Sequence, residues 1–183
     1  MLTDSAVWPT IGTAPSRAEH ITCTRTVLWQ PAHGGAGTTT LRLACGLGEE
    51  PAGLVDDSSS PRASAVVVTA RTHAIGLIRA QELAYKFSAQ VPSASDDVLA
   101  GLVLVADAPG RLPKPLAELS HLVSGGYPVT WWVPWVEAWR LGEPPSPTNA
   151  PKVLARMAKH LAELCEPIDL RAHPATTPSL RAG

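Results

Sequence analysis

The sequence has no long apolar run, no basic segment and few cysteines. None of its apolar runs approaches the ~20 residues of a membrane-spanning helix. Basic and acidic residues nearly balance, at 15 and 16, and the basic residues form no cluster, so no nucleic-acid groove is indicated. Cys23, Cys45 and Cys165 lie far apart, outside the spacing of metal ligands. We therefore expect the three cysteines to be small buried or semi-buried residues in a reducing cytosol.

Patterns of several enzyme classes are also missing. No spacing resembles a triad around a serine or cysteine nucleophile, and none resembles a cluster of metal ligands. The first 19 residues lack a basic region followed by an apolar stretch. We therefore expect no secretion signal and a cytoplasmic location.

Four short apolar runs, each followed by a loop and a helical pattern, are the main feature that is present. They cover residues 26–30, 65–70, 101–106 and 129–133. Such β-branched runs without alternation are typical of strands buried on both faces. Strands alternating with helices predict a three-layer α/β fold with a mostly parallel sheet. We expect one domain over residues 21–166, a flexible arm over residues 1–20 and a flexible tail over residues 167–183.

Apolar residues at helical spacing predict helices over residues 74–89, 115–123 and 152–165. Asn149 is the expected N-cap of the last of these helices, and Gly125 with Gly126 can end the second. The segment 48–62 is rich in Gly, Pro, Ser and Asp, so we expect a flexible loop there.

A glycine-rich segment joins the first expected strand to a helix expected over residues 39–47. Its residues are His33, Gly34, Gly35, Ala36, Gly37, Thr38, Thr39 and Thr40. Glycines let the backbone curl so that N–H groups point inward, and a helix N-terminus adds about half a positive charge. Threonine hydroxyls can bind phosphate oxygens or Mg²⁺. The segment predicts a phosphate-binding loop, with an ordinary strand-to-helix turn as the alternative.

This segment resembles the deviant phosphate loop of the MinD/ParA ATPases, whose pattern is Lys-Gly-Gly-x-Gly-Lys-Thr-Thr. The resemblance implies a P-loop NTPase-like fold, ATP or ADP as the ligand, and Mg²⁺ bound by Thr39. Asp107 ends a strand similar to one whose Asn helps to hold adenine in that family, and Pro134 opens a segment that looks like its proline loop. The chain also resembles an uncharacterised family of actinobacterial proteins that share the His-Gly-Gly-Ala-Gly loop.

The departures from the MinD/ParA pattern bear on activity. His33 and Thr38 stand where that family has its two loop lysines, and no Asp-x-x-Gly switch follows the loop. Threonine cannot supply the positioned positive charge on which phosphoryl transfer depends. We therefore expect weakened binding and little or no ATP hydrolysis.

Arg71, in the sequence Arg71-Thr72-His73, could supply the missing charge. Carboxyl ends of parallel strands share one edge, so Arg71 could contact a phosphate bidentately; a surface arginine in a helix-capping segment is the alternative. His33 is either a phosphate contact or a loop histidine bonded to backbone. Asp107 either binds adenine or a partner, or belongs to a plain turn.

Four of the six tryptophans fall within residues 131–139. Trp131 and Trp132 must point to opposite faces of their strand, and we expect both to pack under helices. Trp135 and Trp139 would share a helix face. Packing in the core and in a lid is favoured, with a partner-binding surface as the main alternative. A stacking platform for nucleic acid would need a basic groove beside the aromatic residues.

Two functions follow from these patterns. The first is an accessory or regulatory protein that binds a nucleotide without efficient turnover and changes its contacts with a protein partner, which could be a second copy of the chain. The second is a pseudo-NTPase scaffold that binds a protein without nucleotide. A slow ATPase that uses Arg71 in place of lysine is a weaker third reading.

Overall fold

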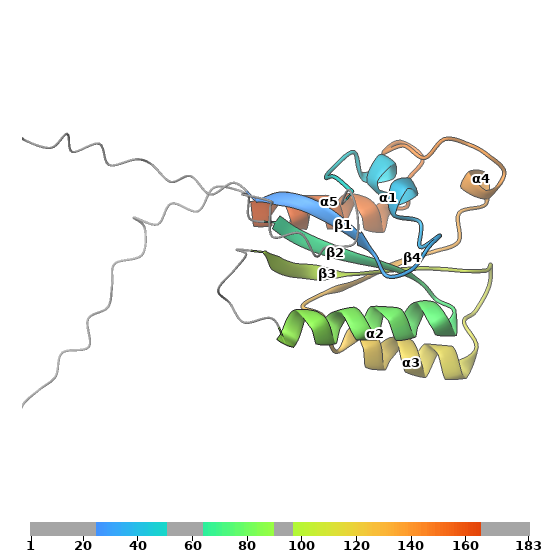
Figure 1. Ribbon diagram of the computed structural model, residues 1–183. Helices are drawn as coiled ribbons and strands as arrows, with labels where there is room; N and C mark the ends of the chain where they lie inside the picture. Colours follow the sequence, from blue (N-terminus) through green and yellow to red (C-terminus); the bar gives the residue numbers. More distant parts are fainter. Residues whose placement is uncertain (1–24, 51–63, 90–96, 166–183) are drawn as a thin grey trace, which may run out of the picture.

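A four-stranded parallel sheet forms the centre of the protein (Figure 1). The computed structural model describes residues 25–50, 64–89 and 97–165, so the arm over residues 1–20 and the tail over residues 167–183 lie outside the described part. The strands pair in the order β1-β2-β3-β4, with β1 at Thr26–Pro31, β2 at Ser64–Arg71, β3 at Val98–Val105 and β4 at Thr130–Val133. The parallel α/β prediction is confirmed.

Helices cover both faces of this sheet, which gives three layers (Figure 1). One face carries α1 and α5, which span Thr38–Cys45 and Lys152–Cys165; the other carries α2 and α3, which span Ala74–Ala89 and Lys114–Ser124. The short helix α4, Glu137–Arg140, lies beyond the sheet edge. Because both faces are covered, seven of the eight residues of β2 are buried, which explains their unbroken apolar run.

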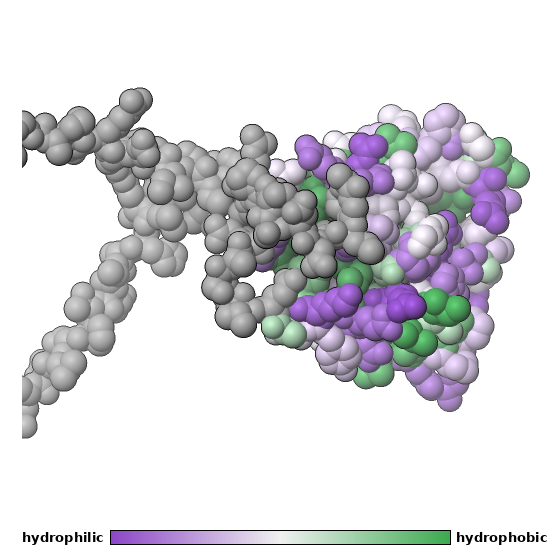
Figure 2. Space-filling view, viewed as in Figure 1, coloured by the Kyte–Doolittle hydropathy of each residue, from purple (hydrophilic) through white to green (hydrophobic). Residues whose placement is uncertain are grey.

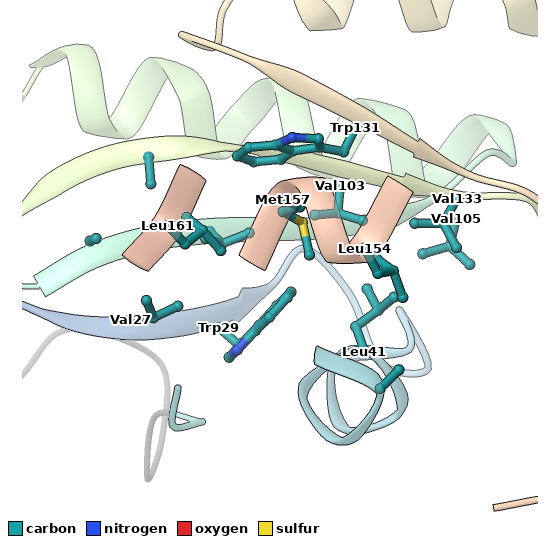
Figure 3. Packing of buried hydrophobic residues seen from close by; sticks show 14 residues of the cluster. Val27, Trp29, Leu41, Val103, Val105, Trp131, Val133, Leu154, Met157 and Leu161 are labelled. Carbon is teal, nitrogen blue, oxygen red and sulfur yellow. The ribbon is translucent and has the colours of Figure 1, made fainter. Parts of the chain in front are cut away.

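The core between the sheet and α5 contains the largest buried side chains (Figure 3). Trp29 of β1 and Met157 of α5 are fully buried there, and Trp131 packs at its β4 end. The helix predicted over residues 152–165 from its apolar spacing is confirmed, because Leu154 and Leu161 are buried beside Met157. Trp29 Nε1 donates a hydrogen bond to the Leu47 carbonyl over 2.8 Å, so its one polar group is satisfied.

The core under α2 and α3 contains only part of the apolar residues on this side of the sheet. Leu77 and Ala80 of α2 are buried, and the buried Tyr127 donates its hydroxyl to the Ala80 carbonyl over 2.6 Å. Leu122, however, is 66% exposed, and Trp132 is 41% exposed. The prediction that Trp132 packs under a helix was therefore wrong: the face is right, but α3 does not cover this position on the edge strand.

The first residues of the expected loop 48–62 are ordered against β1. Glu49 forms a parallel bridge with Leu28, with its N–H donating to the Val27 carbonyl over 2.9 Å. A Cβ on Gly48 would lie 2.7 Å from Trp29 Nε1 and 2.8 Å from the Val27 carbonyl oxygen, so only glycine lets the chain approach β1 this closely. The rest of the expected loop, including Asp56 and Asp57, falls in residues 51–63, outside the described residues.

Neighbouring strands β1 and β2 send their following helices to opposite faces of the sheet, as α1 lies on the side of α5 and α2 on the side of α3 (Figure 1). The loops after β1 and β2 therefore diverge. In open parallel sheets such a divergence leaves a crevice at the carboxyl ends of the strands, where ligands bind. The glycine-rich loop and Arg71 both lie at this point.

No helix in the described ranges has the length and apolar character required to cross a bilayer.

Candidate functional site

The glycine-rich loop turns sharply from β1 into α1. Gly35 and Gly37 have φ angles of 78° and 95°, in the left-handed region that glycine adopts without strain. Ala36 N–H donates to the His33 carbonyl over 3.2 Å. No side chain caps the first turn of α1. Because the first N–H groups of a helix lack intrahelical partners and carry partial positive charge, this end of α1 favours an anion.

The three threonines of the loop have different surroundings. Thr38 is buried, whereas Thr40 is half-buried and lines a cleft described below. Thr39 is exposed, and its hydroxyl donates to Glu50 Oε2 over 3.2 Å. Glu50 also accepts a hydrogen bond from Arg42 Nε over 3.3 Å. Thr39, the expected magnesium ligand, therefore faces Glu50 and is not among the residues that line the cleft.

Arg71, the last residue of β2, extends its side chain across the glycine-rich loop. Its Nε donates to the Gly35 carbonyl over 3.4 Å, and its Nη1 donates to the Ala106 carbonyl over 3.2 Å. Nη2 lies 3.7 Å from the point that a Cβ on Gly37 would occupy. The guanidinium thus lies between the loop and the end of β3, and it brings to the loop a positive charge that the loop itself lacks.

A cleft of about 210 Å³ lies beside Arg71, and we call it the Arg71 cleft. The beginning of α1 and the ends of β2 and β3 form one side, and the segment after β4 forms the other. The described residues that line it are Gly37, Thr40, Leu41, Arg71, Val105, Ala106, Pro134, Trp135, Val136, Trp139 and Arg140. Arg140 is thus a second cation in the cleft. Its Cζ lies 5.6 Å from the centroid of the Trp135 ring, a cation–π contact.

Residues 134–150, which we call the strap, are held together by Asn149. Asn149 Oδ1 accepts hydrogen bonds from Trp139 Nε1 and from Ser146 N–H, each over 3.0 Å. Its Nδ2 donates to the Pro144 carbonyl over 3.0 Å. The prediction that Asn149 caps α5 was therefore wrong: the helix begins at Lys152, and Asn149 fixes the tryptophan wall of the cleft instead.

His33 is bonded to backbone on both sides of its ring. Nε2 accepts the Arg71 N–H over 3.1 Å, and Nδ1 lies 2.9 Å from the Gly34 carbonyl oxygen. The His33 and His73 ring centroids are 4.8 Å apart. His73 in turn accepts the Gly76 N–H at Nδ1 over 3.0 Å, in the first turn of α2. Of the two interpretations of His33, the structure agrees with the loop histidine bonded to backbone. His73 caps the first turn of α2, as the helix-capping alternative for this segment predicts.

Asp107 lies in a second hollow, the Asp107 pocket, of about 390 Å³. The loop 107–113, the beginning of α3 and the exposed Trp132 form its walls, and it shares Ala106 and Pro134 with the Arg71 cleft. The Asp107 N–H donates to Thr72 Oγ1 over 3.1 Å. The carboxyl edge of the sheet therefore carries two adjacent hollows, one basic and one mostly apolar.

The structure brings together only part of the predicted site. Gly37, Thr40, Arg71 and Pro134 line one cleft, whereas Asp107 belongs to the adjoining pocket. Gly34 and Gly35 lie at the exposed tip of the loop, and Ala36 is buried beneath it.

Sequence reasoning missed Gly76 and Arg140. A Cβ on Gly76 would lie 2.5 Å from the Arg71 carbonyl oxygen and 2.8 Å from His33 Nε2. An isolated glycine in a helical pattern is a recognisable sign of such a close approach. Arg140 had no comparable signal, because its place in the cleft depends on how the strap folds back.

Magnesium is the metal implied by the resemblance to MinD/ParA ATPases. Within the described residues, no group of three or more His, Cys, Asp or Glu side chains is arranged to hold a metal ion. Thr39 and Glu50 nevertheless offer hydroxyl and carboxylate oxygens, the donors that Mg²⁺ prefers when it is bound together with phosphates. Their chemistry fits this ion as a companion of a phosphate ligand.

The fold and site define an α/β protein with a parallel sheet, whose glycine-rich strand-to-helix loop is completed by an arginine from the neighbouring strand. The chain belongs to a family of unknown function, DUF6668, which it matches over residues 25–157. No curated protein and no solved structure matches it significantly.

Proposed function

We propose that this protein binds ATP or ADP through its phosphates in the Arg71 cleft, with little or no hydrolysis, and serves as an accessory or regulatory protein. The observation that carries the proposal is the guanidinium of Arg71, whose Nη2 lies 3.7 Å from the Cβ point of Gly37. This arrangement supports a reduced P-loop NTPase-like architecture of the MinD/ParA type, in which the cation comes from β2 and not from the loop.

Electrostatics support an anionic ligand. Arg71 and Arg140 both line the cleft, and the N-terminus of α1 adds its partial positive charge at Gly37. Arginine presents a planar fork that matches two phosphate oxygens. The walls of the cleft are largely apolar elsewhere, which strengthens these charge interactions by excluding water.

The adjoining Asp107 pocket supports a nucleotide over a bare phosphate. Its apolar walls suit a planar base, and the Asp107 carboxylate can accept a hydrogen bond from an adenine amine. Ala106 and Pro134, common to both hollows, would then contact the middle of the ligand. Thr39 and Glu50 do not line the cleft, so they would hold a magnesium ion at its margin, next to Thr40, where the ion would neutralise part of the phosphate charge.

The cleft lining argues against efficient hydrolysis. Phosphoryl transfer to water requires a side chain that orients the attacking water. The described residues lining the cleft include no carboxylate, histidine or side-chain amide. Two of the Arg71 N–H groups are also bonded to the carbonyls of Gly35 and Ala106, which leaves fewer donors for a transition state.

Calorimetric titration with ATP and Mg²⁺ tests the proposal. We expect micromolar binding by the unaltered protein, at least tenfold weaker binding by Arg71→Ala, and none by Gly37→Val, whose side chain would be strained at φ 95° and would approach Arg71. Arg79→Ala is the matched control, because Arg79 is an exposed arginine of α2 that pairs with Glu82 and does not line the cleft. Absence of binding at millimolar ATP would refute the proposal.

A second candidate function, a protein-binding scaffold without nucleotide, has support from one surface. Ile75, Ile78 and Tyr85 of α2 are 65%, 45% and 66% exposed. Figure 2 shows apolar surface near the beginning of α2, at the carboxyl edge of the sheet, beside a hydrophilic band. If ATP does not bind, loss of partner capture by Ile75→Ser with Ile78→Ser would favour the scaffold.

A further inference from the structure

The ring of His33 fills the space between the glycine-rich loop, the end of β2 and the first turn of α2. A backbone N–H can only donate, so His33 Nε2 must carry a lone pair to accept the Arg71 N–H. A carbonyl oxygen can only accept, so Nδ1 must carry the hydrogen that points to Gly34. The two bonds together require one neutral tautomer of His33, and both ring nitrogens are used.

Gly76 makes this position of the ring possible. A Cβ there would lie 2.8 Å from His33 Nε2, closer than real Cβ contacts, and 3.2 Å from Cδ2, which is a tight contact. The absence of a side chain at position 76 thus opens the space into which the imidazole fits. His73, whose ring is 4.8 Å from that of His33, closes the same space from the beginning of α2.

These contacts form a closed circuit with Arg71. His33 belongs to the loop and holds the backbone of Arg71, while the Arg71 side chain returns to the same loop at the Gly35 carbonyl. The loop conformation and the guanidinium position are therefore fixed together. The loop itself contains no lysine, and its cation is the Arg71 side chain of the neighbouring strand.

We infer that His33 is the positioning residue for Arg71: its Nε2 anchors the Arg71 backbone so that the guanidinium stays over Gly37 and ready for a phosphate. This inference rests on the proposed function for its ligand, whereas its geometry rests on the contacts among His33, Arg71 and Gly35. His33 itself is not expected to contact the phosphate, since both of its nitrogens are already bonded to backbone.

Variants of His33 separate this role from general support of the fold. The side-chain oxygen of His33→Gln can take the position of Nε2, whereas that of His33→Asn reaches only the position of Nδ1. With ATP and Mg²⁺ as the probe, we expect His33→Gln to bind within about threefold of the unaltered protein, and His33→Asn and His33→Ala to bind at least tenfold more weakly. Equal binding by the Gln and Asn variants would overturn the inference.

A double-mutant cycle with Arg71→Ala is the stricter test. Since His33 is inferred to act through Arg71, the double variant His33→Ala/Arg71→Ala should bind no more weakly than Arg71→Ala alone. Losses that multiply would show that His33 acts independently of Arg71, against the inference. Circular dichroism and thermal melting identify any variant that fails to fold.

Nuclear magnetic resonance of the ligand-free protein distinguishes failure of the inference from failure of the proposed function. We expect the Arg71 Nε–H signal to be distinct in the unaltered protein and in His33→Gln, and to move to the value of a solvated arginine in His33→Ala. An unchanged signal in His33→Ala would overturn the inference whether or not ATP binds. A changed signal in a protein that does not bind ATP would reject the nucleotide proposal and leave the positioning role established.

Discussion

Replacing Gly76 with alanine should destabilise the protein, although alanine is the better residue for a helix interior. Gly76 lies in the first turn of α2 and is buried. The added Cβ would meet the Arg71 carbonyl oxygen at 2.5 Å and His33 Nε2 at 2.8 Å. The first contact is with backbone, so no change of side-chain rotamer can relieve it.

The magnitude follows from two opposing effects. Alanine in place of glycine favours a helix by ~0.5–1 kcal/mol, while forcing a methyl group into a well-packed region costs ~1–3 kcal/mol. We expect the contact to dominate, because the shift needed to reach an ordinary 3.4 Å separation from the carbonyl would move the start of α2 away from β2. The net loss of unfolding free energy is then ~1–2 kcal/mol.

Equilibrium unfolding in urea measures this loss. Gly34→Ala is the matched control, because nothing lies within 4 Å of its Cβ point and Gly34 does not adopt a positive φ; its change should stay within ~0.5 kcal/mol. Adding His33→Ala to Gly76→Ala should restore part of the loss, since it removes the ring but not the Arg71 carbonyl. A Gly76→Ala variant as stable as the unaltered protein would refute the reasoning.

Two further predictions concern the strap and a half-buried thiol. Asn149→Ala should lower the unfolding free energy by ~1–2 kcal/mol, measured in urea, because it removes three hydrogen bonds at an exposed site; Asn149→Asp, which keeps the acceptor for Trp139, should lose less, and equal losses would contradict this account. Burial raises the pKa of Cys45 to about 12, so between pH 9 and 12 the folded state keeps a proton that the unfolded state loses, and stability should fall as the pH rises through this window. Urea titrations across that range check the sign, and a Cys45→Ala variant with an undiminished slope would exclude Cys45 as the cause.

Local patterns predicted the layers of the fold well. The strands are buried on both faces and therefore read as apolar runs, and the buried stripe of α5 appears directly in the spacing of Leu154, Met157 and Leu161. These features are properties of a few consecutive residues, since helical and extended chains repeat at fixed short periods. Gly46, in the left-handed conformation, ends α1 two residues before the expected end.

Tertiary contacts overrode local signals at three described positions. Trp132 lies on the face that its alternation with Trp131 predicts, but β4 is an edge strand and α3 leaves it 41% exposed. Asn149 has the chemistry of an N-cap, yet its side chain bonds to Trp139 ten residues earlier. Gly48 reads as a loop residue, yet it packs against Trp29 because the chain returns to β1.

Local sequence patterns were enough to predict a three-layer α/β protein in which a glycine-rich loop joins the first strand to a helix. The residue that completes that loop became evident from the tertiary structure. Arg71 reaches Gly35 across 36 residues of chain because β2 pairs with β1 and no other strand comes between them. The spacing of apolar residues in a helix or strand is a property of neighbouring residues, whereas the order of strands in a sheet depends on contacts between distant residues. The pairing of β1 with β2 therefore brings the cation, the histidine and the glycine of α2 to one place.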